Sequence, residues 1–565
     1  MKIILRRISF AALVFLGTVL LYRPSARYAF VDHDDPEYVI ENPNMREGLT
    51  WENMKWAFTS VGYANNWHPL AWISMMVDVT LAGPLDDLTW KQRDNRVAHV
   101  MHLHNILLHA SNAVLLFFLL GLFLGKDCDS KGDILRLLLT LFWAVHPLRC
   151  EVVCWCSERK ELTSVFFMLF SLIAYIYPAS GAVRRHVNYW VSVVLFALAI
   201  LAKPVAITLP TVMFAWDWIF KGKPRWLKVT PFILLSLACC FLTISSQKGA
   251  LESGADQLIC QRLESIFVAP LVYIRQTLWP SGLSCFYKLT YTMNWVGVCF
   301  GVLLVLMMVW VCVRWLRRRE PWAAIATFGV VWLYVGLLPM LGVVKVGSQE
   351  HADRYTYWIG CGLCAVLALC WKQAKGSSWL CRSTGTALPR LAKAGLCGIL
   401  VLAYMTHLRM GVWRNTFTLL RDSLPKSWDG TVAGNLACHL AATGEPEDRK
   451  EAEMWLRATM AHRASTAACA ELAFFLSLSH RPQPKIGFED EDPYAEAKYL
   501  AHRALTGDKD QPVAWEALGN CDCAEGKWED AIAKFEKAMS YSTRPKHVRQ
   551  KIVFCRERLA HDERR

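Results

Sequence analysis

Two adjacent carboxylates near the N-terminus are the residues best suited to chemistry. Asp34 and Asp35 stand in the segment FVDHDDPEYV, which NPN closely follows. A carboxylate pair can act as a general base, as a cation ligand, or as both. Asp and Pro also favour solvated turns. The local sequence leaves both interpretations open, so the choice depends on the elements that flank the pair.

Four cations stand near carboxylates elsewhere in the chain, namely Arg159, Lys160, Lys203 and Arg354. Arginine grips a phosphate through two parallel hydrogen bonds, and lysine holds it as a point charge. The four cations are therefore candidates for binding one anionic group. Internal salt bridges explain the same charge pattern equally well. The carboxylates available for such bridges are Glu158, Glu161, Glu350 and Asp353.

Histidines form a third group of candidates. His68 lies in the segment NNWHPL, and His102 shares a helical spacing with Asn105 and His109. A metal site is one interpretation of that spacing. Hydrogen bonds between packed helices are favoured, because no acidic ligand is interleaved. His146 precedes a group of cysteines that lacks the paired C-x-x-C spacing of structural zinc sites.

The elements that must position these residues are membrane spans. Of the 565 residues, 54% are hydrophobic and 19% are charged, against about 25% charged in soluble domains. The net charge of +14 falls in short clusters between apolar runs, which indicates membrane topology and no nucleic-acid partner. A span needs about 20 mostly apolar residues. Eleven spans are predicted, near 4–22, 98–124, 134–150, 162–178, 187–202, 204–220, 229–246, 294–313, 322–341, 356–371 and 392–409.

Basic residues indicate how these spans are oriented. The first span is interpreted as a retained anchor, because no small-x-small cleavage site follows its apolar core. With a cytoplasmic N-terminus, every predicted cytoplasmic loop then carries Lys or Arg, as the positive-inside rule requires. The outward segments are 23–97, 247–293, 342–355 and everything after about 410. The carboxylate pair and the four cations all fall on this outward side.

The polar region after the last span contains a repeated pattern. Residues 512–545 carry most of the Trp, Gly and Ala spacing of a tetratricopeptide repeat, and degenerate copies precede them at 430–464 and 466–507. Other Ala-rich helical hairpins share part of this pattern, but the match favours true repeats, whose concave surface binds peptides or proteins. The sequence therefore predicts a transmembrane domain over 1–410 and a repeat domain over 411–565.

Six segments, taken in order, resemble a known family. They are FVDHDDPEYVIENPN, NWHPLAWISMMVD, HLHNILLHASNAVLLFFLL, HPLRCEVVCWCSERKELTSVFF, KPVAITLPTVMFAWDWI and ADRYTYW. Together with the repeats, they are similar to the transmembrane and tetratricopeptide-repeat-containing O-mannosyltransferases, especially the bacterial relatives, of the C-type glycosyltransferase superfamily. The resemblance implies an all-α fold, in which a polytopic helix bundle is followed by a short repeat solenoid.

The resemblance also implies a reaction. The donor would be a polyprenyl-phosphate-linked sugar, with mannose expected, and the acceptor a Ser or Thr hydroxyl of an exported or membrane protein held by the repeats. The paired acidic motif of the family matches Asp34-Asp35, and its Arg-Tyr motif matches Arg354-Tyr355. Asp34 is expected to be the base, while Asp35 would orient the acceptor or support a divalent cation, Mg²⁺ or Mn²⁺.

The remaining candidates complete the predicted site, for which no metal ligand is named. Arg354, Lys160, Arg159 and Lys203 would stabilise the charge on the leaving phosphate. One displacement through an oxocarbenium-like state would invert the anomeric carbon. The expected substrate-pocket residues are His68, His102, His146, Glu158 and Tyr355.

Two other classes of protein remain as alternatives. A lipid-linked sugar flippase would also need polar residues within the membrane, but no inverted repeat is evident and the carboxylates cluster on one side. A non-catalytic scaffold would recruit partners through its repeats and would need no polar pocket. The outward compartment would be the periplasm of a bacterium, across its inner membrane, or the endoplasmic-reticulum lumen of a eukaryote.

Overall fold

The structure is a computed structural model in which every assigned element is a helix. It describes residues 1–85, 87–125, 128–246, 259–287, 294–341, 349–375, 378–426, 430–443, 445–462, 466–478, 492, 494–541 and 545–562. The chain divides into two compact units, Met1–Leu419 and Leu420–Arg565. This division lies close to the boundary expected after residue 410.

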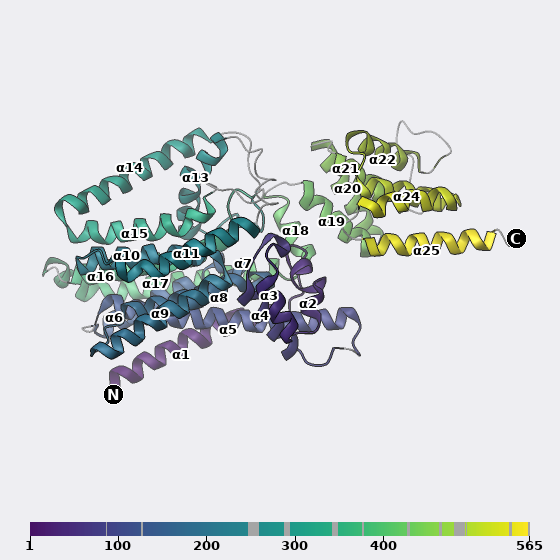
Figure 1. Ribbon diagram of the computed structural model, residues 1–565. Coiled ribbons are helices and arrows are strands. Elements are labelled where there is room, and N and C mark those ends of the chain that lie inside the picture. Colours follow the sequence, from purple (N-terminus) through teal and green to yellow (C-terminus); the bar gives the residue numbers. More distant parts are fainter. Residues whose placement is uncertain are drawn as a thin grey trace. The chain divides into compact units, whose positions relative to one another are not determined.

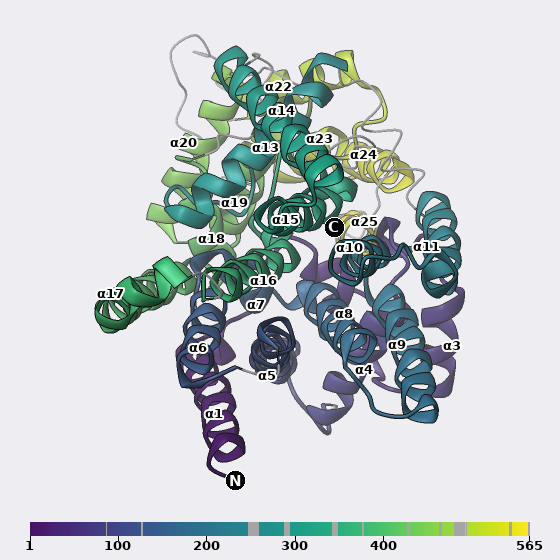
Figure 2. The same ribbon diagram turned by 90° about the vertical axis from the view of Figure 1, so that its left-hand side faces the viewer.

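The first unit is a bundle of long helices that lie side by side (Figure 1) and are seen close to end-on in Figure 2. Eight helices of the described residues are long and apolar enough to cross a membrane, and α6 with α7 forms a bent pair that makes a ninth. The predicted all-α, polytopic bundle is therefore confirmed. The long helices are α1 (Lys2–Tyr22), α5 (Trp90–Leu124), α6 (Ser130–Ala144), α9 (Ala182–Ala202), α11 (Trp226–Ser246), α14 (Trp295–Arg318), α15 (Pro321–Leu337), α16 (Thr356–Lys375) and α17 (Ser378–Val412).

Two of the eleven predicted spans are helices that are not long and apolar enough to qualify singly as membrane spans. Helix α8 (Arg159–Ile176) occupies the segment predicted at 162–178, and its first turn carries three charged residues. Helix α10 (Leu209–Lys221) follows a 3-10 turn and occupies the segment predicted at 204–220. Both helices contact several neighbours in the bundle, so protein rather than lipid covers much of their surface.

Ion pairs connect the basic segments at the N-terminal end of the bundle. Asp133, near the start of α6, is fully buried and pairs with Arg6 and, at 3.2 Å, with Arg7. Lys375 at the end of α16 pairs with Asp129 at 3.0 Å. Three of the segments predicted to be cytoplasmic therefore lie together at one end, as the positive-inside pattern requires.

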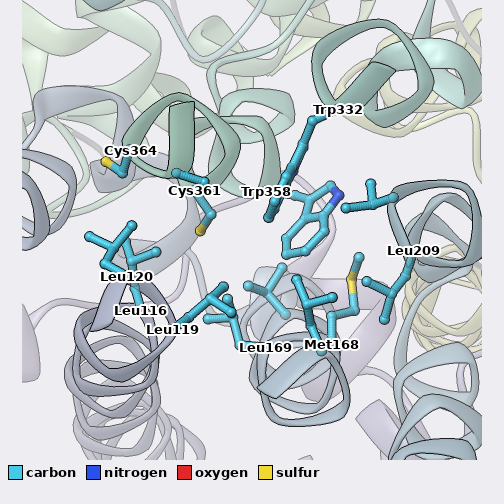
Figure 3. Packing of buried hydrophobic residues seen from close by; sticks show 14 of the residues in the cluster. Leu116, Leu119, Leu120, Met168, Leu169, Leu209, Trp332, Trp358, Cys361 and Cys364 are labelled. Carbon is cyan, nitrogen blue, oxygen red and sulfur yellow. The ribbon is translucent and has the colours of Figure 1, made fainter. Parts of the chain in front are cut away.

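Aromatic and sulfur-containing side chains fill the core of the bundle (Figure 3). The indole rings of Trp332 in α15 and Trp358 in α16 lie 4.8 Å apart between their centroids. Gly362, one turn after Trp358, allows this approach, because a Cβ atom there would lie 2.5 Å from Trp332. Helices α15 and α16, which precede and follow the segment that carries Arg354, are thereby held at a fixed separation.

Short helices cover the other end of the bundle, away from the N-terminus (Figure 1). They are α2 (Pro43–Arg46), α3 (Trp51–Thr59), α4 (Pro69–Leu81) and α7 (Cys150–Cys154). Tyr38, Met45, Trp72 and Met75 form a second buried core beneath the first three. This core fixes the segment that contains Asp34 against the ends of the long helices.

Helix α13 (Ile259–Leu278) fills part of the outward segment 247–293, where no element was predicted. Hydropathy missed this helix because polar residues such as Glu264, Arg275 and Gln276 interrupt its apolar face. Helix α13 packs against α14. A Cβ atom on Gly301 of α14 would lie 2.3 Å from the α13 backbone, so the two helices are in very close contact.

The second unit consists of consecutive antiparallel helix pairs. The pairs are α19 (Gly430–Thr443) with α20 (Pro446–His462), α21 (Thr466–Ser477) with α22 (Ala495–Gly507), and α23 (Pro512–Ala524) with α24 (Trp528–Tyr541). Helix α18 (Thr416–Ser423) precedes them, and α25 (Pro545–Asp562) packs on α24. These bounds match the three predicted repeats, although most of the insertion at 481–493 lies outside the described residues. The tetratricopeptide assignment itself stays a prediction.

Candidate active site

A cavity of about 360 Å³ lies at the outward end of the first unit. Six separate segments of the chain supply its polar lining, which includes a carboxylate from the first outward segment and a guanidinium from the last. The polar lining residues are Asp34, Asn66, His68, Glu158, Lys160, Lys203, Thr243, Arg354 and Tyr355. Seven of the eleven predicted site residues therefore meet at one place.

Asp34 presents its carboxylate to the cavity. Its side chain is 36% exposed, and Oδ2 accepts a hydrogen bond of 3.3 Å from Nζ of Lys160. Burial alone would raise the pKa of Asp34, but the charges of Lys160, His33 and Arg354 outweigh it and hold the pKa below its usual value. Asp34 is therefore ionised at neutral pH and in contact with the cavity.

Asp35 points away from the cavity and is almost fully buried. Its carboxylate accepts hydrogen bonds from the Val31 amide at 3.0 Å, the Ser157 amide at 2.9 Å and the Ser157 hydroxyl at 2.5 Å. Burial raises the pKa of Asp35 to about 6, although these three hydrogen bonds oppose the rise. Asp35 therefore joins the Asp34 segment to the turn before Lys160, at a place where it cannot touch an acceptor in the cavity.

Three cations converge on the cavity, and each is also paired with a carboxylate. Lys203 Nζ lies 2.9 Å from both Glu158 and Glu161. Lys160 Nζ lies 3.5 Å from Glu158, and Arg354 pairs with Glu151. Burial alone would raise the pKa of Glu158, but Lys203, Lys160 and Arg354 lower it to about 2. The phosphate-binding and salt-bridge interpretations of these three cations are thus compatible.

Arg159 belongs to a different network from its neighbour Lys160. The guanidinium is fully buried, 2.6 Å from Asp78 Oδ2, and it donates hydrogen bonds to Asn105 and to the Met101 carbonyl. It does not line the cavity. The expectation that Arg159 contacts the donor phosphate is therefore corrected. The position of Arg159 in the first turn of α8 directs its side chain toward α4 and α5 and away from the cavity.

Only one of the three predicted pocket histidines lies at the cavity. His68 lines it while being 4% exposed, and among the described residues no hydrogen-bond partner is found for its Nδ1. Burial lowers the pKa of His68 well below 6.5, so the ring is neutral. His102 contacts Cys156 Sγ, and His146 contacts the Thr277 carbonyl through Nε2. His102 and His146 therefore take part in helix packing, outside the cavity.

The oxygen atoms of Asp34 and Asp35 are not arranged as ligands of a divalent cation. Asp34 is paired with Lys160, and both oxygens of Asp35 are already hydrogen-bond acceptors for Val31 and Ser157. Within the described ranges, no group of three or more His, Cys, Asp or Glu residues could hold a metal ion. A Mg²⁺ or Mn²⁺ site at the carboxylate pair therefore has no support in the arrangement of these side chains.

One wall of the cavity is apolar. It is formed by Val205 and Ile207 after Lys203, by Ile244 near the end of α11, and by Pro339 and Met340 after α15. These segments are the outward ends of membrane helices. The cavity therefore combines a charged floor with a wall of the kind that an isoprenoid chain can contact.

Several residues of the site were not assigned a role from the sequence. The Tyr38 ring lies 4.6 Å from Lys160 Nζ, and Trp155 lies within 5.6 Å of both Lys160 Nζ and the Arg354 guanidinium carbon. Ser157 anchors Asp35, and Glu151 anchors Arg354. All four stand within segments that carry the family resemblance, but nothing in their own spacing distinguishes them from packing residues.

Comparison with known proteins gives four matches, all to proteins named protein O-mannosyl-transferase. Protein O-mannosyl-transferase TMTC4 of Mus musculus is 22% identical over 465 residues, which cover 69% of this chain and 58% of the relative. The Homo sapiens protein of that name is 23% identical over 464 residues. Protein O-mannosyl-transferase TMTC1 of Mus musculus is 27% identical over 175 residues, or 29% of this chain and 16% of the relative.

This chain spans less than two thirds of the length of the TMTC4 relatives. No family model matches the sequence. The matches nevertheless confirm the resemblance that the six motifs carry.

Proposed function

Because this chain is related to the protein O-mannosyl-transferases, we propose that it is a membrane glycosyltransferase that transfers a sugar, mannose in the first instance, from a polyprenyl phosphate to a Ser or Thr hydroxyl of a protein. The observation that carries the proposal is the single cavity in which the Asp34 carboxylate faces Lys160, Lys203 and Arg354. One side of this cavity suits a nucleophile that must lose a proton, and the other suits an anionic leaving group.

The three cations bind the donor phosphate in this proposal. Lys203 and Arg354 are 10% and 13% exposed through their side chains, which is enough to reach a ligand from inside the cavity. Charge-assisted hydrogen bonds from both would stabilise the extra negative charge that the phosphate gains as the sugar leaves. The apolar wall of Val205, Ile207 and Met340 then receives the first isoprene units of the lipid.

Asp34 accepts the proton of the attacking hydroxyl. As the bond from the acceptor oxygen to the anomeric carbon forms, the bond from that carbon to the phosphate oxygen breaks, and the hydroxyl proton passes to the Asp34 carboxylate. Attack opposite the leaving phosphate inverts the anomeric carbon in one step. This sequence requires no metal ion, since the side-chain cations already face the leaving group.

Asp35 acts as a positioning residue in this mechanism. Its hydrogen bonds to Val31 and Ser157 hold the Asp34 backbone against the turn that leads into Lys160. A base must be placed within a few tenths of an ångström to be effective. His68, neutral and lining the same cavity, offers a ring nitrogen to a sugar hydroxyl.

The acceptor is proposed to be an exported protein that the second unit binds through its helix pairs. With an odd number of spans and a cytoplasmic N-terminus, that unit faces the outward side, as Asp34 does. This places the reaction in the periplasm if the chain is bacterial, or in the endoplasmic-reticulum lumen if it is eukaryotic. A flippase would not need a base at the cavity.

The test is transfer of labelled mannose from polyprenyl-phosphate mannose to exported proteins by the purified chain, with the modified residue located by mass spectrometry. We expect Asp34→Asn to lower the transfer rate by about 10²–10⁴-fold, the range that a general base contributes. The Asn side chain keeps the shape of Asp34 but cannot accept the proton.

The matched control is Glu37→Gln, which removes an exposed carboxylate three positions later and outside the cavity. It should leave the rate within twofold of the native protein. A folded Asp34→Asn variant that transfers sugar at the native rate would refute the base assignment. Absence of transfer from any polyprenyl-phosphate sugar, with flipping of the same lipid observed in vesicles, would favour the transporter.

A further inference from the structure

Two cysteines of the second unit lie sulfur to sulfur across a helix interface. Cys523, near the end of α23, and Cys555, in α25, are separated by 3.7 Å between their Sγ atoms. No disulfide joins them in the structure, where both are free thiols. The distance is close to van der Waals contact, and the two atoms must approach by about 1.7 Å to reach S–S bonding distance.

The packing around the pair fixes this approach. Val548, Ile552 and Cys555 recur at helical spacing on the buried face of α25, and they pack with Phe535 of α24. Cys523 borders the same cluster from α23. A second set of contacts holds α25 to α23 further along, since Lys551 pairs with Glu516 at 2.7 Å and donates to Asn520 at 2.9 Å. The apolar cluster and the Lys551 contacts together hold α25 against its neighbours, and this packing brings the two sulfur atoms close to each other.

The two thiols differ in access. Cys555 is fully buried, and burial raises its pKa to about 12, so its thiol is a poor nucleophile toward an outside reagent. Cys523 is only partly buried and borders solvent. An oxidant can therefore reach Cys523 first. Cys555 lies deeper in the interface, within contact distance of the Cys523 sulfur.

We propose that Cys523 and Cys555 form a disulfide that fastens α25 to the last helix pair. The oxidant is a disulfide of the thiol-exchange class, which an exported domain meets outside the cytoplasm. The Cys523 thiolate attacks this disulfide, forms a mixed disulfide and releases one thiol. The Cys555 sulfur then attacks the Cys523 sulfur and releases the second thiol, so two protein thiols and one disulfide yield one protein disulfide and two thiols.

The consequence is a covalent link within the helix stack. The buried face of α25 packs on α24, and the disulfide would join the same helix to α23. Closing a loop between positions 523 and 555 restricts the unfolded chain. The oxidised second unit should consequently unfold at a temperature about 5–15 °C above that of the reduced one.

The test uses the full chain in detergent, reduced and then treated with oxidised glutathione. Remaining thiols are blocked under denaturing conditions, and peptides are analysed by mass spectrometry without reduction. We expect a peptide containing Cys523 joined to one containing Cys555, together with the upward shift in unfolding temperature.

Cys523→Ser and Cys555→Ser should each abolish the shift, whereas Cys521→Ala, two positions from Cys523 on the same helix, should retain both the linkage and the shift. If a variant misfolds, the native protein alone still tests the proposal, because the linked peptide is detected in the native protein by mass spectrometry. Recovery of both cysteines as free thiols, or of Cys523 still carrying glutathione, would overturn the proposal. Neither result depends on sugar transfer.

Discussion

At the scale of single residues, neighbours in the sequence have different roles in the structure. Asp34 faces the cavity and Asp35 is buried beneath it. Lys160 faces the same cavity, whereas Arg159 is paired with Asp78 on another side of α8. Successive residues of a helix point roughly 100° apart, which explains why Arg159 and Lys160 at the start of α8 reach different networks.

The burial of Asp35 predicts a pH-dependent stability. Its pKa is raised from 3.8 to about 6 in the folded protein, so its contribution is fully present below about pH 4 and is lost as the pH rises through 6. This change amounts to about 3 kcal/mol at most. The unfolding temperature of the native protein, minus that of Asp35→Asn, should therefore increase as the pH is lowered from 7 to 4.5.

Comparing the native protein with Asp35→Asn separates the contribution of Asp35 to stability from the contributions of other carboxylates. The pKa of Glu158 is lowered to about 2, so its contribution is retained above about pH 4.5 and lost only at more acidic pH. The difference between native and variant unfolding temperatures cancels the groups that they share. A difference that stays constant between pH 7 and 4.5 would mean that Asp35 titrates normally.

At the scale of elements, buried charge pairs connect the outward helices to the bundle. Asp78 of α4 contacts Arg159 of α8 at 2.6 Å and His104 of α5 at 2.7 Å. Both Asp78 and Arg159 are fully buried. We expect Arg159→Met to destabilise the first unit by about 3–5 kcal/mol, because it leaves the Asp78 charge without its closest partner.

The double variant Arg159→Met with Asp78→Asn supplies the control for this prediction. Removing both charges should restore most of the lost stability, since no unpaired charge then remains buried. Thermal unfolding in detergent measures Arg159→Met, Asp78→Asn and the double variant. A loss in the double variant equal to the sum of the two single losses would show that the two residues contribute independently.

The close packing of α15 against α16 predicts that a larger residue at Gly362 destabilises the first unit. A Cβ atom on Gly362 would lie 2.5 Å from the Trp332 ring, which packs against Trp358 and has little room to move. Gly362→Ala should therefore destabilise the first unit by about 1–3 kcal/mol. Gly398→Ala in α17 is the matched control, because a Cβ there would meet nothing within 4 Å.

The outcome is read from the thermal unfolding of both glycine variants. The control should be neutral or slightly stabilising, since Ala favours a helix over Gly by up to about 1 kcal/mol. Equal unfolding temperatures for the two variants would show that α15 and α16 separate easily, and would contradict the tight packing in Figure 3.

At the scale of the whole molecule, charge determines which side of the membrane each part faces. The N-terminal end of the bundle lies opposite the end that carries the short helices α2, α3 and α4 (Figure 1). With eleven spans, the C-terminus should lie on the same side as Asp34. In sealed vesicles whose outward side is exposed, added protease should remove a C-terminal tag and leave an N-terminal tag intact. Removal or protection of both tags together would require an even number of spans.

Local patterns in the sequence were sufficient to predict the long apolar helices. Apolar runs of sufficient length become helices wherever the backbone must satisfy its own hydrogen bonds, and all eleven predicted segments are helical. Among the described residues, eight helices qualify singly as spans, because α8 has a charged first turn, α10 is short and α6 qualifies only as a bent pair with α7. Helix α13 was missed because polar residues, among them the buried Glu264 and Gln276, lower the hydropathy of its segment.

The sequence by itself determined the class of protein and the candidate residues, and it predicts an orientation, because hydropathy and charge act locally along the chain. Only the tertiary structure decided which candidates share a cavity. Asp34 and Arg354 meet through the packing of distant helices, while Arg159, His102 and His146 turn into other interfaces. The physical reason is that the direction of a side chain depends on the rotation of its helix, which is fixed by contacts that no single segment contains.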